Sequence, residues 1–486
     1  MRSSNLFSNS IYSFLFRFVN IIFPFITYPY VARILLPEAL GNYEFLTSIS
    51  NIFILLASFG IPSIAIRELS PLINLKINKF EAMASNFFTL HFISSFILLT
   101  VFYFLYFLGI FDTSFTFFSI FLFSSFLHFL STEWILQTFS DFKFILIKQV
   151  IIKTLSLILI LLLVKSSSDI IIYIFITFFT SIFSTLMILF RSLSLTKLKV
   201  LSFSKLKFSY FKGFIIIFLV SVITSFYSII DRFMLNSLGA FYLGLYSLSI
   251  KIPGLIINLI SSLFVVLMPI LSKLLFTNQK GLLKSIAINS FYLLSFISIP
   301  FAIFIFFFSS EIVYYLFSSN YNEAVISLSI LSPTIFFVSS TYLFGMQLLI
   351  SHKKEVLLLL STLIGLVLNL FLNLVLTNRY FHIGSSLSLL FTEIVVFSIQ
   401  FYFIYINLKI KITLKPIFNY LVIGIFSFGL VKGFYYYLNN STFLLFIFAS
   451  IVSFILYLFL LFLSKDLIFK KLIQYILKYI KLYKIH

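Results

Sequence analysis

The sequence predicts an all-α polytopic membrane protein of about 14 transmembrane helices, in two six-helix lobes around a central cavity plus two C-terminal helices. The chain is 61% hydrophobic and only 10% charged, and its mean hydropathy is +1.15. Apolar runs of about 20 residues, long enough to cross a bilayer as a helix, recur from one end of the chain to the other. The connections between them are short, so we expect no separate soluble domain.

The apolar runs place the expected helices along the chain. These helices are 8–32, 42–66, 84–108, 115–137, 146–164, 170–190, 213–235, 241–268, 285–308, 324–350, 356–376, 383–406, 417–437 and 443–464. The first six and the next six form comparable halves, separated by a basic connection. The expected parts are an N-terminal lobe (1–190), a cytoplasmic linker (191–212), a C-terminal lobe (213–406), helices 13 and 14 (407–464) and a basic tail (465–486).

The distribution of Lys and Arg predicts the orientation. With the N-terminus inside, 27 of the 34 basic residues lie on the cytoplasmic side, three lie outside and four lie within spans. Cytoplasmic loops carry such an excess, so both termini are expected in the cytoplasm. The same loops explain the net charge of +20 without nucleic-acid binding. The tail, 465–486, alternates Lys with apolar residues, which fits an amphipathic helix on an anionic leaflet or a solvated tail.

The four basic residues counted within spans are Arg17, Arg232, Lys251 and Lys432. The expected span 146–164 also contains Lys148 and Lys153, which the count above assigns to the cytoplasmic side. A charge at a helix centre in the bilayer costs about 2.5–3.5 kcal/mol, so it normally faces a bundle interior or a wet cavity. Arg17 lies about nine residues into its span, which corresponds to a depth of about 14 Å. Lys251 lies at a comparable depth in a span of the other lobe. A basic interior of this kind suggests a path for something anionic.

The opening of the chain carries several distinctive motifs. They are PYVARILLPE (29–38), GNYEF (41–45), FGIP (59–62) and IRE (66–68), followed by EWILQ (133–137) and DFK (141–143). These segments resemble the polysaccharide-biosynthesis membrane proteins known as Wzx-type O-antigen and repeat-unit flippases. Two departures are Leu36, where the family usually has Gly, and the absence of the customary Gly after the Trp-x-x-Gln element. Neither departure removes a charge.

The resemblance implies the fold and function of the multidrug/oligosaccharidyl-lipid/polysaccharide exporter superfamily. Members move lipid-pyrophosphate-linked sugars from the inner to the outer leaflet by alternating access. It thus implies an undecaprenyl-pyrophosphate-type lipid-linked oligosaccharide as substrate, a location in the bacterial cytoplasmic membrane, and a role in O-antigen or capsule assembly beside a polymerase.

The implied substrate gives the basic residues candidate roles. Arg17 and Lys251 are the expected pyrophosphate contacts, since Arg binds phosphate by bidentate hydrogen bonds and Lys as a point charge; buried pairs or snorkelling are the alternatives. Arg33 and Arg232, near outer span ends, receive the headgroup on release or anchor at the interface. Lys432 is expected to snorkel.

Glu393 stands mid-span and is the candidate for H+ or Na+ coupling, with a salt bridge between helices as the alternative. Pro253-Gly254 is the candidate hinge, or a kink without a moving part. The chain has no Cys, which excludes disulfides and thiolate metal sites, and no metal or other cofactor is expected.

Two other functions stay open. A membrane polymerase or glycosyltransferase usually needs catalytic groups in a large outer loop or a soluble nucleotide-sugar domain, and the sequence shows neither. A multidrug or cation antiporter should carry more in-span acids than bases, whereas four bases here face one clear acid. The sequence therefore favours a transporter of an anionic cargo over an enzyme.

Overall fold

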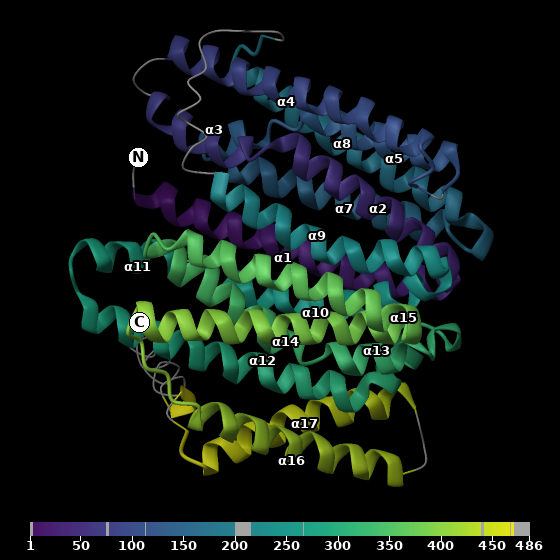
Figure 1. The fold of residues 1–486 in the computed structure, drawn as a ribbon, viewed down its shortest axis with the longest axis vertical. Helices are drawn as coiled ribbons and strands as arrows, with labels where there is room; N and C mark the ends of the chain where they lie inside the picture. Colours follow the sequence, from purple (N-terminus) through teal and green to yellow (C-terminus); the bar gives the residue numbers. More distant parts are fainter. Residues whose placement is uncertain are drawn as a thin grey trace. The chain divides into compact units, whose positions relative to one another are not determined.

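The all-α prediction is confirmed by a computed structural model, which describes residues 3–73, 77–111, 113–199, 215–265, 267–438, 442–466 and 468–470. Every regular element in these ranges is a helix (Figure 1). They form two compact units, Met1–Gly244 and Leu245–His486, and the division falls inside one helix. Residues 200–212 of the predicted linker lie outside the described ranges, so the predicted lobe limits stay a prediction.

The elements of the first unit follow the apolar runs of the sequence. They are α1 (Ser3–Ile34), α2 (Pro37–Ser58), α3 (Ile61–Leu69), η1 (Ser70–Leu72), α4 (Ile77–Phe107), α5 (Phe115–Leu127), η2 (His128–Leu130), α6 (Glu133–Thr138), α7 (Phe142–Leu163), η3 (Ser167–Asp169), α8 (Ile170–Leu195) and α9 (Ile215–Leu238).

Local sequence signals set several helix starts in this unit. Pro37 begins α2, at a position where its missing N–H costs no hydrogen bond. The side chains of Ser114 and Asp141 accept hydrogen bonds from backbone N–H groups in the first turns of α5 and α7. Gly60, with φ 71°, turns the chain between α2 and α3. Within the unit, α1 packs on α7, and α2 packs on α4, α5 and α9.

A glycine contact joins α2 to the start of α10 (Ala240–Phe264) within the first unit. A Cβ added to Gly41 would collide with the Ala240 carbonyl, and one added to Gly244 would collide with the Pro37 carbonyl. Small residues let membrane helices approach backbone to backbone in this way. The two helices therefore touch at a point where no side chain fits between them.

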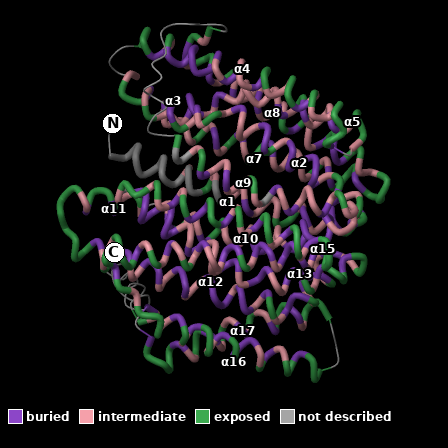
Figure 2. The backbone as a smooth tube through the Cα atoms, in the orientation of Figure 1, coloured by how far each residue is buried: buried purple, intermediate pink, exposed green. Residues whose placement is uncertain are grey.

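The second unit continues along α10 and ends with a helix pair. Its further elements are α11 (Leu267–Phe276), α12 (Lys280–Leu316), η5 (Ser319–Tyr321), α13 (Ala324–Leu331), α14 (Thr334–Thr341), a π-helical segment η6 (Tyr342–Leu349), α15 (Glu355–Asn407), α16 (Lys415–Tyr437) and α17 (Phe443–Leu463). In Figure 2, α12 shows mostly buried and half-buried residues, because α13, α14, α16 and α17 pack around it.

The longest helix, α15, is two antiparallel halves. Phe381 at its middle has φ 50° and ψ −131°, which breaks the helix. Thr377 Oγ1 lies 3.0 Å from Ser385 Oγ, and Gln400 Nε2 donates to Ser361 Oγ at 3.1 Å. These contacts pair positions at nearly equal distances on either side of the break, so the two halves lie side by side. They correspond to the predicted helices 356–376 and 383–406.

The described part holds 11 helices long and apolar enough to cross a membrane, or up to 12 if the bent pair 324–331 and 334–349 forms one span. α15 counts once in these numbers, and α1 contributes only a shorter apolar stretch, Phe18–Ile34. The chain is thus a multi-pass membrane protein, and the figure of fourteen spans stays a prediction.

Candidate functional site

In the first unit, an arginine of α9 reaches the polar face of α2. Arg232 Nη1 donates to Ser48 Oγ at 2.6 Å and lies 3.8 Å from Glu44 Oε2. Glu44 and Ser48 share one face because they are four residues apart on a helix. The Glu44 side chain is only 3% exposed and that of Arg232 18%. Arg232 is therefore a partner of a buried carboxylate, and its predicted contact with a headgroup stays a prediction.

A second ion pair, between a buried lysine and a half-buried glutamate, joins α7 to α6. Lys148 Nζ is 3.3 Å from Glu133 Oε2, and the Lys148 side chain is 3% exposed. Gln137 donates to the other carboxylate oxygen at 3.2 Å. The count of basic residues assigns Lys148 to the cytoplasmic side. In the structure Lys148 lies inside α7, which begins at Phe142, and its side chain is buried.

The candidate cations of the predicted site have different surroundings. Arg33 is exposed in the last turn of α1, and Lys251 is half-buried in α10. The side chain of Arg17 lies outside the described residues. α10 runs through Pro253 and Gly254 without a break, so the hinge role of these two residues stays a prediction.

The α15 halves enclose a row of polar groups. Asn373 Nδ2 donates to the Asn369 carbonyl at 3.0 Å, and Thr377 Oγ1 donates to Asn373 Oδ1 at 2.7 Å. Glu393, further along the second half, is buried with 3% exposure. Its burial fits either a coupling group or a structural one, so coupling stays a prediction.

In the second unit, Lys432 of α16 pairs with Glu311 of α12. The expectation that Lys432 snorkels stays a prediction. Its ammonium also lies 5.2 Å from the ring centre of Phe308 and 5.8 Å from that of Tyr435. Both side chains of the pair are largely shielded. The sequence analysis ended this helix at residue 308 and therefore left Glu311 outside it. The apolar residues after Glu311, up to Leu316, could have indicated that the helix continues.

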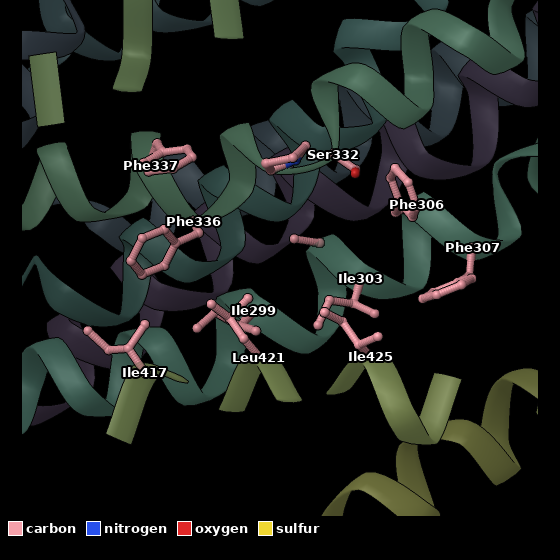
Figure 3. A pocket seen from close by; sticks show the side chains of 12 residues that line it. Ile299, Ile303, Phe306, Phe307, Ser332, Phe336, Phe337, Ile417, Leu421 and Ile425 are labelled. Atoms are coloured by element: carbon pink, nitrogen blue, oxygen red, sulfur yellow. The ribbon is translucent and has the colours of Figure 1, made fainter. Parts of the chain in front are cut away.

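An apolar pocket of about 380 Å³ opens among α12, α14 and α16 (Figure 3). Ser332, which precedes α14, is the one polar residue in its wall. Pro333 immediately precedes α14, and the chain bends by 42° between α13 and α14. The side chains that fill the view come from all three helices, and they are Ile299, Ile303, Phe306, Phe307, Phe336, Phe337, Ile417, Leu421 and Ile425. The pocket suits a hydrocarbon chain.

Among the described residues, no three His, Asp or Glu side chains come close enough to hold a metal ion.

The sequence matches a known family. A family model described as "Polysaccharide biosynthesis protein" matches residues 6–275, more than half of the chain. This chain belongs to the polysaccharide biosynthesis protein family. A second model, MatE, matches residues 203–375. A comparison with curated proteins gave no significant match.

Several solved structures have a fold similar to that of this chain. The lipid II flippase MurJ in an inward closed conformation matches with a TM-score of 0.75 at 16% identity, covering 95% of this chain and 100% of its own. An inward-facing multidrug resistance MATE transporter matches with a TM-score of 0.62 at 12% identity, covering 82% and 94%. A superfamily transporter from Pyrococcus furiosus matches with a TM-score of 0.59 at 15% identity, covering 83% and 95%. The chain therefore shares the fold of these three proteins.

Basic and acidic residues within the helices are closer in number than the sequence analysis predicted. Lys148, Arg232 and Lys432 each lie beside a carboxylate, from Glu133, Glu44 and Glu311 respectively. The argument from four bases against one acid is therefore wrong for the described spans. The expectation of an anionic cargo therefore rests on the family and not on the balance of charges.

Replacing Arg232 by alanine is expected to lower the free energy of unfolding by about 1–3 kcal/mol, because the Glu44 carboxylate stays buried after its nearby cation is gone. The double variant R232A/E44Q should recover most of the loss. The measurement is equilibrium unfolding of the purified protein in detergent. Arg67→Ala is the matched control, since the Arg67–Glu68 pair is exposed and should be worth less than about 1 kcal/mol. Equal losses in R232A and R232A/E44Q would contradict this pairing.

Proposed function

We propose that this protein moves lipid-pyrophosphate-linked oligosaccharide repeat units across the bacterial cytoplasmic membrane by alternating access, for O-antigen or capsule assembly. The observation that carries the proposal is the polysaccharide biosynthesis family model over residues 6–275. The superfamily fold and the multi-pass helices support transport rather than catalysis. Both termini are proposed to be cytoplasmic, on the side of the basic connections.

Such a substrate needs two contrasting environments in one protein. Its polyprenyl chain needs an apolar surface, and the pocket of α12, α14 and α16 supplies one of about 380 Å³. Its pyrophosphate cannot cross hydrocarbon alone and needs compensating cations. Arg17 and Lys251 are the proposed contacts, by bidentate hydrogen bonds and as a point charge respectively.

The test is transport by the purified protein in liposomes loaded with undecaprenyl-pyrophosphate-linked oligosaccharide, read as sugar that becomes accessible to a glycosidase in the opposite leaflet. Arg17→Ala and Lys251→Ala should each lower the rate by about tenfold or more, the effect of losing one charge-assisted contact. Arg17→Lys and Lys251→Arg keep the charge and should retain more activity. The exposed Lys354→Ala should transport like the wild type. Wild-type rates in both alanine variants would contradict the cation site.

The energy source is proposed to be a H+ or Na+ gradient acting through Glu393. In the same liposomes, Glu393→Gln should make transport insensitive to the gradient that drives the wild type. Transport by Glu393→Gln that still follows that gradient would remove Glu393 from the coupling.

A multidrug antiporter is the second candidate, because the MatE model matches residues 203–375. The liposomes separate the two functions. Efflux of an organic cation such as ethidium, with no movement of the lipid-linked oligosaccharide, would favour the antiporter.

A further inference from the structure

A second pocket in the unit Leu245–His486 is rich in tyrosine. It measures about 810 Å³ and lies where α12 and α16 end and α13 begins. Two tyrosine pairs line it, Tyr314-Tyr315 from α12 and Tyr435-Tyr436 from α16, together with Glu311 and Asn322. Its volume falls within the range of small-ligand sites, about 300–1,000 Å³. None of the steps of the proposed function uses it.

One tyrosine of each pair is fixed in the wall. The ring of Tyr315 stacks on Phe446, with 5.4 Å between ring centres and 24° between planes. The hydroxyls of Tyr315 and Tyr435 are 3.4 Å apart, and Tyr435 is only 9% exposed. These contacts hold the rings of Tyr315 and Tyr435 in the wall of the pocket.

The other tyrosine of each pair lines the pocket and is largely exposed. Tyr314 is 60% exposed and Tyr436 is 80% exposed, although both line the pocket. Tyrosine offers an apolar face and a polar tip on a side chain with few rotatable bonds. A ligand that stacks on either ring has an apolar face of its own and polar groups at its edge.

The polar groups of the wall add no net charge. Ser310 Oγ donates to Glu311 Oε2 at 2.8 Å, and the other carboxylate oxygen pairs with Lys432. The ammonium is thus neutralised, which disfavours a phosphate as the ligand. The carboxylate, the Asn322 amide and the tyrosine hydroxyls together offer several acceptors and donors.

We propose that this tyrosine pocket binds the saccharide part of the transported molecule. A pyranose ring has an apolar face of C–H groups and a rim of hydroxyls, which matches stacking on Tyr314 and Tyr436 and hydrogen bonding to Glu311 and Asn322. The inference rests on the proposed function for the origin of the saccharide.

The pocket lies on the side where the sugar is delivered. α12 begins at Lys280, after Lys273, and α16 begins at Lys415, after Lys409 and Lys411. Both helices thus start at basic connections and reach the pocket at their far ends. By the distribution of basic residues, the far end faces the exterior. The pocket holds the sugar after it has crossed.

Tyrosines also gather at membrane interfaces without binding any ligand, and the test separates this role from sugar binding. Tyr380, at the turn of α15, is 53% exposed, and Tyr437, which adjoins the pocket pair but does not line the pocket, is 85% exposed. Tyr380→Ala/Tyr437→Ala is therefore a matched control for Tyr314→Ala/Tyr436→Ala. Tyr314→Leu/Tyr436→Leu serves if the alanine variant unfolds.

The probe is the oligosaccharide repeat unit released from its lipid-linked precursor by mild acid, which hydrolyses the bond between sugar and pyrophosphate and leaves the free saccharide. Titration calorimetry with full-length protein in nanodiscs measures its Kd. Tyr314→Ala/Tyr436→Ala should raise the Kd by about tenfold or more, and the control pair by less than about twofold. No binding by the wild type, no loss in the pocket variant, or equal losses in both variants would overturn the proposal.

The liposome transport assay distinguishes a failure of the saccharide pocket from a failure of the proposed function. A wild-type protein that transports the lipid-linked molecule but does not bind the released saccharide overturns the pocket alone. A wild-type protein that binds the saccharide but transports nothing overturns the proposed function alone.

Discussion

Lys432→Met is expected to lower the free energy of unfolding by about 2–3 kcal/mol. Breaking a buried ion pair by removing one partner costs about 3–5 kcal/mol, and the partial exposure of the two side chains, 23% for Lys432 and 13% for Glu311, reduces that figure. Methionine keeps the length and apolar stem of lysine, so the loss reports the charge. The variant also loses the contacts of the ammonium with the rings of Phe308 and Tyr435.

The double variant Lys432→Met/Glu311→Gln should recover most of that stability, because it leaves no charge behind in the bundle. Lys354→Met is the control, since Lys354 is exposed and should change stability by less than about 0.5 kcal/mol. Equilibrium unfolding in detergent measures all three. If Lys432→Met is as stable as the wild type, the ammonium reaches solvent by snorkelling and the pair with Glu311 contributes nothing.

Gly244→Ala is expected to destabilise the first unit by about 1–3 kcal/mol, the usual cost of overpacking. The added methyl group would collide with the Pro37 carbonyl, which is backbone and moves only if α2 moves. Gly41→Ala should behave alike, because its methyl group would meet the Ala240 carbonyl. The measurement is the thermal unfolding midpoint in detergent.

Gly254→Ala, in the same helix α10, is the matched control. A Cβ at Gly254 meets no atom within 4 Å, and alanine stabilises a helix interior relative to glycine by about 0.5–1 kcal/mol. We therefore expect opposite signs at the two positions. A loss of stability at both would mean that α10 does not tolerate alanine in general, and the close contact with α2 would then not explain Gly244.

The sequence predicted some features of the candidate site and missed others. Lys251 and Glu393 lie inside helices, as the apolar runs indicated. The partners of Arg232 and Lys432 were missed, because Ser48 is 184 residues from Arg232 and Glu311 is 121 residues from Lys432. A hydropathy pattern carries no information about contacts over such separations.

By itself the sequence determined the helical class, the membrane setting and most of the helix positions, including the two halves of α15. These properties depend on the transfer of each segment from water to hydrocarbon, and that free energy is set by the residues of the segment itself. Only the tertiary structure decided which charges are neutralised and where pockets open. Those outcomes depend on which helices pack together and on which residues lie level with one another. For this reason Lys148 and Lys432 are ion-paired, and the tyrosines of α12 and α16 line one pocket.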